Sequence, residues 1–363
     1  MPIINISNID ISLARYAYTI EEIVDDLLKN KLDEEVKDFC KRELGIKKVY
    51  KSYDLSKVKF DDTGYLAPHI ELNDMYVESA KKALSPSRKP SDVGLLVTIN
   101  DNQQYLDPAP TVEIAIKLGL NKDVRTQNFQ GMACASFSEA LLNAAGHFAL
   151  GHDSDVLVLI GTYYTSWFLD RIKQIGHISM KNRKDFNNFI YFLIFSDTVA
   201  AALLSQSDGQ IAQINTEFVS SRKDTTPDGY KKATISLAPD SSFRVVFDMD
   251  VNSKILRERA ASLSLENILH IKQTFPTDFE NVKVWGLHPA GRVFVDYIRE
   301  RCGIERAKSQ LTYDLMMETG NTGAASSLQL ISESVKRKTL RRGELGGIID
   351  YGWEGADAFI YKA

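Results

Sequence analysis

The sequence predicts an α/β fold with a duplicated architecture, and three observations lead to that prediction. Short, branched apolar runs alternate with helical stretches, which is typical of a sheet with helices on both faces. The two halves share one order of elements: helix, strand, a turn with a candidate reactive residue, helix and strand. The chain has 363 residues, 44% of them hydrophobic, enough for two domains or one large duplicated one. No sequence repeat accompanies the shared order, so the duplication is predicted from the elements alone.

The first half contains predicted strands and helices in alternation. Helical spacing of Met75, Ala80 and Ala83 predicts a helix that ends at the turn residues 85–87. The branched apolar run 93–99, bounded by turn residues, predicts a strand buried on both faces. We expect strands at residues 2–6, 93–99, 124–130 and 155–161, and helices at 20–28, 33–43, 72–84, 111–118 and 136–150.

The second half begins a similar pass at Phe195. Residues 167–192, just before it, read as irregular and rich in aromatic side chains, so they either line a pocket or fill the core. The closing apolar run 347–351 predicts a last strand. Between these points we expect extended segments at 212–218, 243–249 and 282–287, and helices at 255–274, 291–301, 312–319 and 323–335.

Charge gives no reason to expect a nucleic-acid partner. The formal net charge is -4 and the pI is about 5.9. The short basic run 336–338, with Arg341 and Arg342, is interpreted as a solvated helix end. We therefore predict that the protein binds no nucleic acid.

The cysteines and the N-terminus indicate a reducing compartment. Cys40, Cys134 and Cys302 cannot all pair and have no metal-ligand spacing, so neither a disulfide framework nor a metal site is expected. The start of the chain lacks a basic segment followed by an apolar core, and no run approaches the ~18 apolar residues of a membrane span. These features predict a cytoplasmic protein without a membrane segment.

Cys134 is the leading candidate for a reactive residue. It stands in a turn of small residues, 131–136, that follows a predicted strand and opens a predicted helix. The free N–H groups and partial positive charge of a helix start favour the thiolate form of a cysteine there. The alternative is a buried thiol that acts only as a small hydrophobic side chain, as we interpret Cys40.

His288 and Asn321 are candidate partners for that thiol. His288 lies in the turn 287–291, which follows a predicted buried strand, and the ends of such strands commonly carry catalytic groups. Asn321 lies between two glycines just before a predicted helix, as a cap or as an amide that faces a ligand. Each residue alone suits a structural role, but together they place a thiol, an imidazole and a carboxamide at the ends of separate core elements.

These three turns resemble a known family. Gly-Met-Ala-Cys-Ala-Ser, Leu-His-Pro-Ala-Gly and Gly-Asn-Thr-Gly-Ala-Ala-Ser look like the catalytic segments of the thiolase superfamily, in the branch of ketoacyl synthase III and chalcone synthase. The order of cysteine, histidine and asparagine matches that branch. Weaker likenesses to other family segments extend over nearly the whole chain: Gly45-Ile46, residues 75–84, 195–201 and 350–352.

The resemblance implies a thiolase-like five-layered α-β-α-β-α duplicated fold that works as a homodimer or with a homologous partner subunit. The N-terminal half, residues 1–188, would carry Cys134, and the C-terminal half, 189–363, would carry His288 and Asn321.

It also implies a condensing enzyme of fatty-acid-derived or polyketide metabolism. Cys134 would take an acyl group from a thioester, with its own N–H and that of Gly352 as the oxyanion hole. His288 and Asn321 would stabilise the enolate of a malonyl or β-ketoacyl thioester, which attacks the acyl group in a Claisen condensation. The substrates would be acyl-CoA or an acyl-phosphopantetheine on acyl carrier protein, with no permanently bound cofactor. Basic residues in 171–184 and Arg222-Lys223 are candidates for contacting the phosphates.

Several positions depart from the family pattern or leave a choice open. Trp353 and Glu354 are foreign to the glycine-rich closing loop, and Ser196 stands where glycine is usual. Asp107 is a candidate base or tunnel residue, although an aspartate before proline is also an ordinary turn residue. Two alternative functions remain: an acyltransferase in which His288 activates an alcohol or amine acceptor, and a non-catalytic partner of an active homologue.

Overall fold

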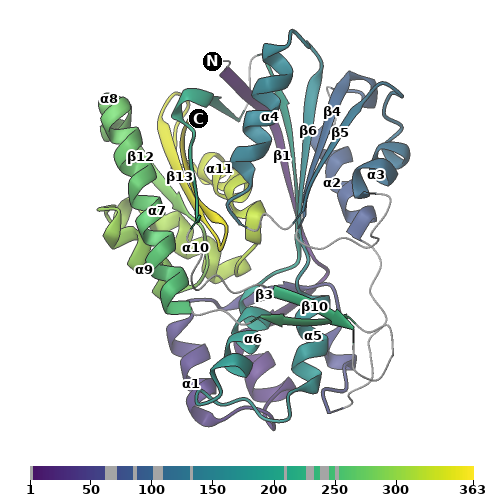
Figure 1. Ribbon diagram of the computed structural model, residues 1–363, viewed down its shortest axis with the longest axis vertical. Coiled ribbons are helices and arrows are strands. Elements are labelled where there is room, and N and C mark those ends of the chain that lie inside the picture. The colour runs from purple at the N-terminus through teal and green to yellow at the C-terminus, as the bar shows by residue number, and fades with distance from the viewer. Residues whose placement is uncertain are drawn as a thin grey trace.

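The structure is a computed structural model (Figure 1). It describes residues 3–61, 72–84, 88–100, 109–130, 134–207, 211–225, 233–237, 245–249 and 253–363. Asp107 and residues 131–133, the start of the Cys134 turn, lie outside the described residues.

A mixed ten-stranded sheet forms the centre of the fold. Its order is β12-β13-β14-β8-β1-β7-β6-β4-β5, and β9 pairs with β14. Lys362 of β14 pairs with Gln213 of β8, and at this point the sheet narrows into two portions. The strands are β1 Ile3–Leu13, β4 Val93–Asn100, β5 Arg125–Gln130, β6 Asp155–Thr162, β7 Thr198–Ser205, β8 Ala212–Asn215, β9 Ser220–Lys223, β12 Val282–Leu287, β13 Leu345–Tyr351 and β14 Gly355–Lys362.

Helices cover both portions of the sheet and lie between them. In Figure 1, α7 and α9 flank β12 and β13 on one side, α4 and α11 lie in the middle, and α2 and α3 cover β4 to β6 on the other side. This arrangement confirms the predicted thiolase-like layers. The helices are α2 Leu72–Leu84, α3 Pro110–Leu118, α4 Phe137–Ala149, α7 Ser253–Thr274, α8 Pro276–Asn281, α9 Arg292–Arg301, α10 Gln310–Thr319 and α11 Ser326–Lys336.

The layers follow from strands that are apolar on both faces. In β6, Val158 packs in the middle cluster with Leu141 of α4 and Ile331 of α11. Its neighbour Leu157 points to the other face and packs in the outer cluster that includes Tyr76 of α2. A continuous apolar run is therefore what a strand between two helical layers requires.

A lower lobe completes the molecule below the layers in Figure 1. It contains α1 Glu34–Glu43, α5 Thr165–Gln174, α6 Arg183–Ile194 and the two-stranded sheets β2 Tyr16–Thr19 with β3 Lys48–Lys51 and β10 Ala233–Leu237 with β11 Val245–Met249. The prediction that residues 167–192 are irregular was wrong, because α5 and α6 occupy most of them. Asn182 caps α6 by accepting the Asp185 N–H at 3.4 Å, a signal that the aromatic side chains obscured.

The strand order also indicates where the two halves of the fold divide. β7 pairs with β1 and β6, so residues 198–205 belong to the N-terminal portion of the sheet. A division after Ser205 therefore fits the pairing better than the predicted boundary between residues 188 and 189. The division itself remains a proposal.

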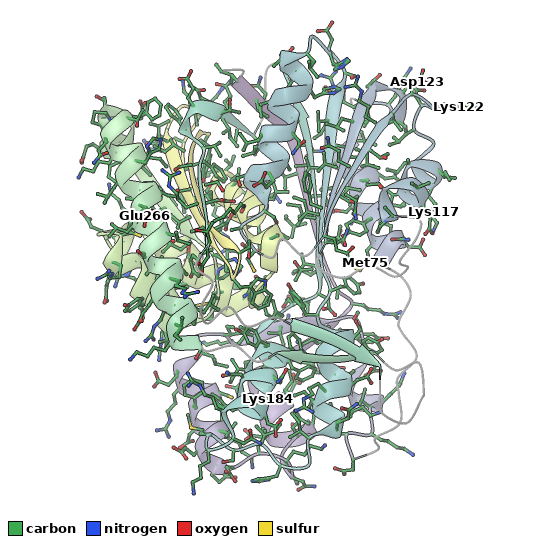
Figure 2. The ribbon with its side chains drawn as sticks, viewed as in Figure 1. Met75, Lys117, Lys122, Asp123, Lys184 and Glu266 are labelled. Atoms are coloured by element: carbon green, nitrogen blue, oxygen red, sulfur yellow. The ribbon has the colours of Figure 1, made fainter. Side chains whose placement is uncertain are left out.

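The outer surface is charged and the described helices are short or polar. Figure 2 shows Lys117, Lys122, Asp123 and Glu266 projecting outward from the outer layers. Lys117 forms a 2.8 Å ion pair with Asp74. Among the described helices, none is both long and apolar enough to cross a membrane.

Candidate active site

Cys134 lies where the predicted turn enters α4. It is buried, with 7% of its surface exposed, and it precedes the first turn of the helix at Phe137. The next residue, Ala135, donates its backbone N–H to Glu354 Oε1 at 2.8 Å. A carboxylate of the closing loop therefore lies beside Cys134, at the positive end of the helix that follows it.

His288 follows β12 and is held through its backbone and its ring. Its N–H donates to the Ile349 carbonyl at 2.9 Å, and the Tyr351 hydroxyl donates to its carbonyl at 2.7 Å. Ring atom Nδ1 is 3.0 Å from the Ser326 hydroxyl. Burial lowers the pKa of His288 to about 3, so the imidazole is neutral at physiological pH. Atom Nε2 bonds to no described residue and is available to a ligand.

Asn321 is fixed by a short bridge to the segment that enters β7. Its N–H donates to the Ile194 carbonyl, and its carbonyl accepts the Ser196 N–H, both at 2.8 Å. Side-chain Oδ1 accepts the Gly323 N–H at 2.8 Å. The amide Nδ2 donates to no described residue, so this group can meet a ligand.

Ser196, which departs from the family pattern, helps to hold this bridge. Its hydroxyl donates to the Thr319 carbonyl at 2.6 Å and accepts the Tyr50 N–H at 2.9 Å. Gly320 lies against it with a φ of +66°, and a Cβ at that position would stand 2.7 Å from the Ile194 carbonyl oxygen. Serine therefore has a structural role here, beside an obligatory glycine.

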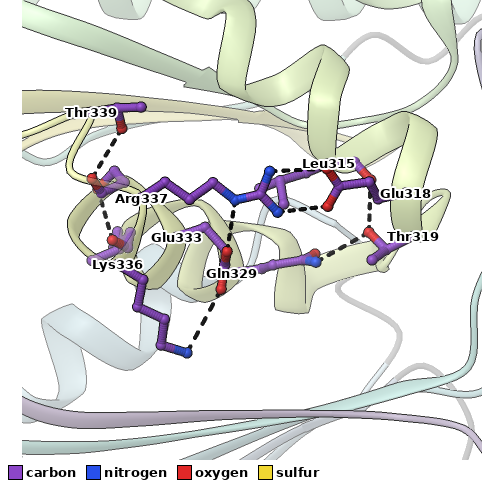
Figure 3. Close-up of polar contacts among 10 residues, drawn as sticks. Leu315, Glu318, Thr319, Gln329, Glu333, Lys336, Arg337 and Thr339 are labelled. Atoms are coloured by element: carbon purple, nitrogen blue, oxygen red, sulfur yellow. Dashed lines mark hydrogen bonds and ion pairs between the residues drawn. The ribbon is translucent and has the colours of Figure 1, made fainter.

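Polar side chains fix the two ends of the Asn321 turn. Gln329 donates to the Thr319 hydroxyl at 3.1 Å, as Figure 3 shows. It also accepts a hydrogen bond from the Thr322 hydroxyl at 2.9 Å. Arg337, directly after the end of α11, binds Glu318 at 2.6 Å, in the last turn of α10 next to the Asn321 turn. The turn between these helices is thereby held on both sides of Asn321.

One cavity brings the predicted catalytic residues together. Cys134, His288 and Asn321 all line a cavity of about 60 Å³, whose lining is mostly apolar. Trp353 of the closing loop also lines it, with its ring 6.2 Å from the ring of Tyr191. The aromatic segment 167–192 thus contributes a wall of this pocket through Tyr191.

A second cavity of about 240 Å³ adjoins the first. The two share Tyr191, Ile194, Ala290 and Phe294 among their lining residues. Lys254, Arg257 and Arg292 also line the second cavity, together with Glu43, which binds Arg292 at 3.0 Å.

The predicted basic candidates lie elsewhere. Arg171 binds Asp185 at 2.8 Å, and Lys223 binds Glu139 at 3.1 Å. Figure 2 shows Lys184 on the lower lobe. Sequence reasoning missed the cations of the second cavity, although Arg292 could have been found from its place directly after the His288 turn.

In the closing loop, residues 351–355, the N–H that was predicted to serve the oxyanion hole is already hydrogen-bonded. The Gly352 N–H donates to the Gly355 carbonyl at 2.9 Å, so it already has an acceptor in this state. The next N–H along the loop, that of Trp353, donates to no described residue, and Trp353 lines the cavity with Cys134. Either N–H can complete an oxyanion hole only if it turns toward the reacting carbonyl.

Comparisons with known proteins agree with the predicted resemblance. Residues 276–352 match the family described as 3-oxoacyl-[acyl-carrier-protein (ACP)] synthase III C terminal. A fungal type III polyketide synthase, ORAS, has a similar structure, with a TM-score of 0.79, 15% identity and 99% of each chain covered.

OleA from Xanthomonas campestris is also similar. A variant solved with bound lauric acid and lauroyl-CoA has a TM-score of 0.77, 17% identity and 99% of each chain covered. The cerulenin-bound protein has a TM-score of 0.75 and 17% identity, over 99% of this chain and 97% of that chain. These likenesses establish the fold and, with the family match, confirm the resemblance to the ketoacyl synthase III and chalcone synthase branch.

Proposed function

We propose that this chain, which has the fold of the thiolase-superfamily condensing enzymes, joins two acyl thioesters by Claisen condensation through an acyl-Cys134 intermediate. The observation that carries the proposal is the single cavity lined by Cys134, His288 and Asn321. A nucleophile and two hydrogen-bonding groups that face one apolar space meet the geometric needs of such a reaction.

In the first half-reaction the Cys134 thiolate attacks the carbonyl carbon of an acyl thioester. The S–C bond to Cys134 forms, the carrier thiol leaves, and the acyl group stays on the enzyme. Backbone N–H groups of Cys134 and of Gly352 or Trp353 would stabilise the tetrahedral oxyanion. For Gly352 this requires release of its hydrogen bond to Gly355.

In the second half-reaction His288 and Asn321 act on the incoming thioester. With Ser326 donating to Nδ1, the neutral His288 ring carries its proton on Nε2, which can donate to the thioester oxygen with Asn321 Nδ2. Loss of carbon dioxide, or transfer of an α-proton to a base, for which Asp107 is the proposed residue, then produces an enolate held by two hydrogen bonds. The enolate carbon attacks the acyl carbonyl, and the Cys134 thiolate leaves as the carbon–carbon bond forms.

The second cavity suits the arm of the carrier. It adjoins the reacting groups, and Lys254 and Arg257 can bind the phosphates of coenzyme A or of a phosphopantetheine on acyl carrier protein, whereas Arg292 already binds Glu43. Acyl-CoA is the better supported donor, because OleA, with the same fold, binds lauroyl-CoA.

A homodimer would form along β5. This strand ends the sheet, so its outer N–H and C=O groups can pair with a second copy. β5 also leads directly into the Cys134 turn, so a dimer there would support the nucleophile from outside the chain. Asp107 stays a proposed base or tunnel residue, since it lies outside the described residues.

The test supplies an acyl-CoA with malonyl-CoA and follows products by mass spectrometry. Condensation releases carbon dioxide and gives a chain-extended β-keto product, whereas an acyltransferase leaves malonate unchanged and acylates an alcohol or amine acceptor. Asn321→Asp is expected to impair decarboxylation more than acylation, because only the enolate needs the amide donor. Equal loss in both steps would contradict the enolate role.

A further inference from the structure

The β13–β14 hairpin contacts each of the three segments that carry the proposed reacting groups. His288 is held directly, by the Ile349 carbonyl at 2.9 Å and the Tyr351 hydroxyl at 2.7 Å. The other two contacts come from a pair of buried aspartates. Asp350 accepts a hydrogen bond from Ser327 in the first turn of α11, and Asp357 accepts one from Ser138 in the first turn of α4.

These aspartates face each other across the hairpin. Asp350 and Asp357 are direct partners in the antiparallel ladder, so their side chains share one face of the sheet. Each is 1% exposed. The second carboxyl oxygen of each, Oδ1, has no hydrogen-bond partner among the described residues. Two carboxylates so placed would repel each other.

Few other charges face the pair. Among the described residues, α4 presents Glu139 and β9 presents Lys223, and these two form their own 3.1 Å ion pair. Ser221 of β9 also contacts Asp357, and the α11 contact is the Ser327 hydroxyl. Burial raises the pKa of Asp350 to about 8 and that of Asp357 to about 6. The pair therefore retains a proton at neutral pH.

We propose that Asp350 and Asp357 share one proton and are positioning residues, which fasten the helix starts behind Cys134 and Asn321 to the strand that holds His288. The inference rests on the proposed roles of those three residues. While the proton is present, each carboxyl group can accept from its serine without repelling the other. When the proton leaves, repulsion separates the two strands or their serine contacts, and the three catalytic segments lose their common support.

Hydrogen exchange of the native protein tests this without any assumption about activity. Between about pH 6.5 and about pH 9.5, after correction for intrinsic exchange, amide protection of residues 134–141 and 321–330 should fall by about tenfold, the equivalent of one pKa unit. Residues 72–84 of α2, which do not contact the pair, serve as the control. Unchanged protection at both helix starts would overturn the proposal.

Asp350→Asn separates a proton-sharing pair from a simple structural contact. The amide can accept from Ser327 and donate to Asp357, so it imitates the protonated carboxyl and does not titrate. We expect this variant to keep its helix-start protection and its kcat at alkaline pH, where both decline in the native protein. An alkaline decline identical to that of the native protein would overturn the proposal. Asp357→Asn is the second variant if the first does not fold.

The proposal and the proposed function fail in different ways. If the native protein shows the alkaline loss of protection but acylates nothing, the acid pair stands and the assignment of the reaction falls. If it acylates and condenses with the same kcat from neutral to alkaline pH, the reaction stands and the acid pair falls.

Discussion

At the scale of single residues, the state of His288 decides what chemistry the cavity can do. The ring is 1% exposed and its pKa is lowered to about 3 by burial, far below the ordinary value of about 6.5. A neutral ring with one nitrogen satisfied by Ser326 can serve the proposed role, which is to donate a hydrogen bond to a developing enolate. That role requires no titration near neutral pH.

The first prediction concerns the pH dependence of this residue. Because its pKa is depressed, His288 stays neutral as pH falls from about 8 to about 5, and kcat/KM for condensation should show no inflection near pH 6.5 from this group. The profile is measured with saturating donor and varied malonyl-CoA. An acid limb near pH 6.5 that disappears in His288→Asn would contradict the neutral ring.

Glu354 gives the second prediction. Its carboxylate accepts the Ala135 N–H beside Cys134, and a negative charge there disfavours the thiolate. Glu354→Gln keeps an acceptor for that N–H but removes the charge, so alkylation of Cys134 by iodoacetamide at neutral pH should quicken by about threefold to tenfold.

Peptide mapping after alkylation identifies the labelled thiol. Glu354→Ala is the control for the hydrogen bond, since it removes both the charge and the acceptor. A Glu354→Gln protein that reacts no faster than the native protein would show that the carboxylate acts only as a structural acceptor.

At the scale of elements, the sequence predicts best those turns in which a candidate reactive residue lies between a recognisable strand and a recognisable helix. Cys134, His288 and Asn321 stand at turns between strands and helices, and those turns could be recognised from small residues and apolar periodicity. The structure brings all three to one cavity. The helices α5 and α6 were missed because aromatic residues give no clear period there.

Other features depend on partners that are distant in the chain. The opposition of Asp350 and Asp357 follows from the register of β13 and β14, and β14 was not predicted as a strand. Lys254 and Arg257 lie on one long helix, where isolated charged residues are normally predicted to face solvent. The second cavity forms only when that helix meets α6 and the His288 turn. Local pattern cannot report such long-range contacts.

The third prediction concerns Tyr351 in the β13–β14 hairpin. The buried Tyr351 hydroxyl donates to the His288 carbonyl at 2.7 Å, and removing it leaves that carbonyl without its donor. Tyr351→Phe should lower the free energy of unfolding by about 1 to 3 kcal/mol and reduce kcat, with little effect on the first acylation. Urea denaturation and single-turnover acylation measure the two effects.

Tyr50→Phe is the matched control, because the Tyr50 hydroxyl bonds to no described residue and its ring packs near Lys48. If Tyr351→Phe and Tyr50→Phe have equal stability and equal kcat, the hairpin does not hold His288 through this hydrogen bond.

At the scale of the whole molecule, the cavity lined by Cys134, His288 and Asn321 lies where the layered part meets the lower lobe. Tyr191 comes from α6 of that lobe, while Cys134 and Asn321 come from the layered part. The cationic second cavity lies at the same junction, with Lys254 and Arg257 from α7. A carrier with phosphate groups would therefore bind across both parts of the fold.

The fourth prediction tests whether the carrier binds in the second cavity. Charge reversal in Lys254→Glu with Arg257→Glu should raise KM for acyl-CoA by about tenfold, equivalent to about 1.4 kcal/mol, while kcat changes little. The KM of the native protein should also rise with salt. Lys272→Glu, near the other end of the same helix, is the control. Equal KM values in all three proteins would place the carrier elsewhere.

The central claim is that Cys134 carries the acyl group, and intact-mass spectrometry after incubation with acyl-CoA tests it most directly. Cys302 offers a matched control, since both thiols are 7% exposed and burial raises the pKa of Cys302 to about 12. We predict one added acyl mass, mapped to Cys134, in the native protein and in Cys302→Ser, and none in Cys134→Ala. An acyl mass that persists in Cys134→Ala, or none in the native protein, would contradict the account.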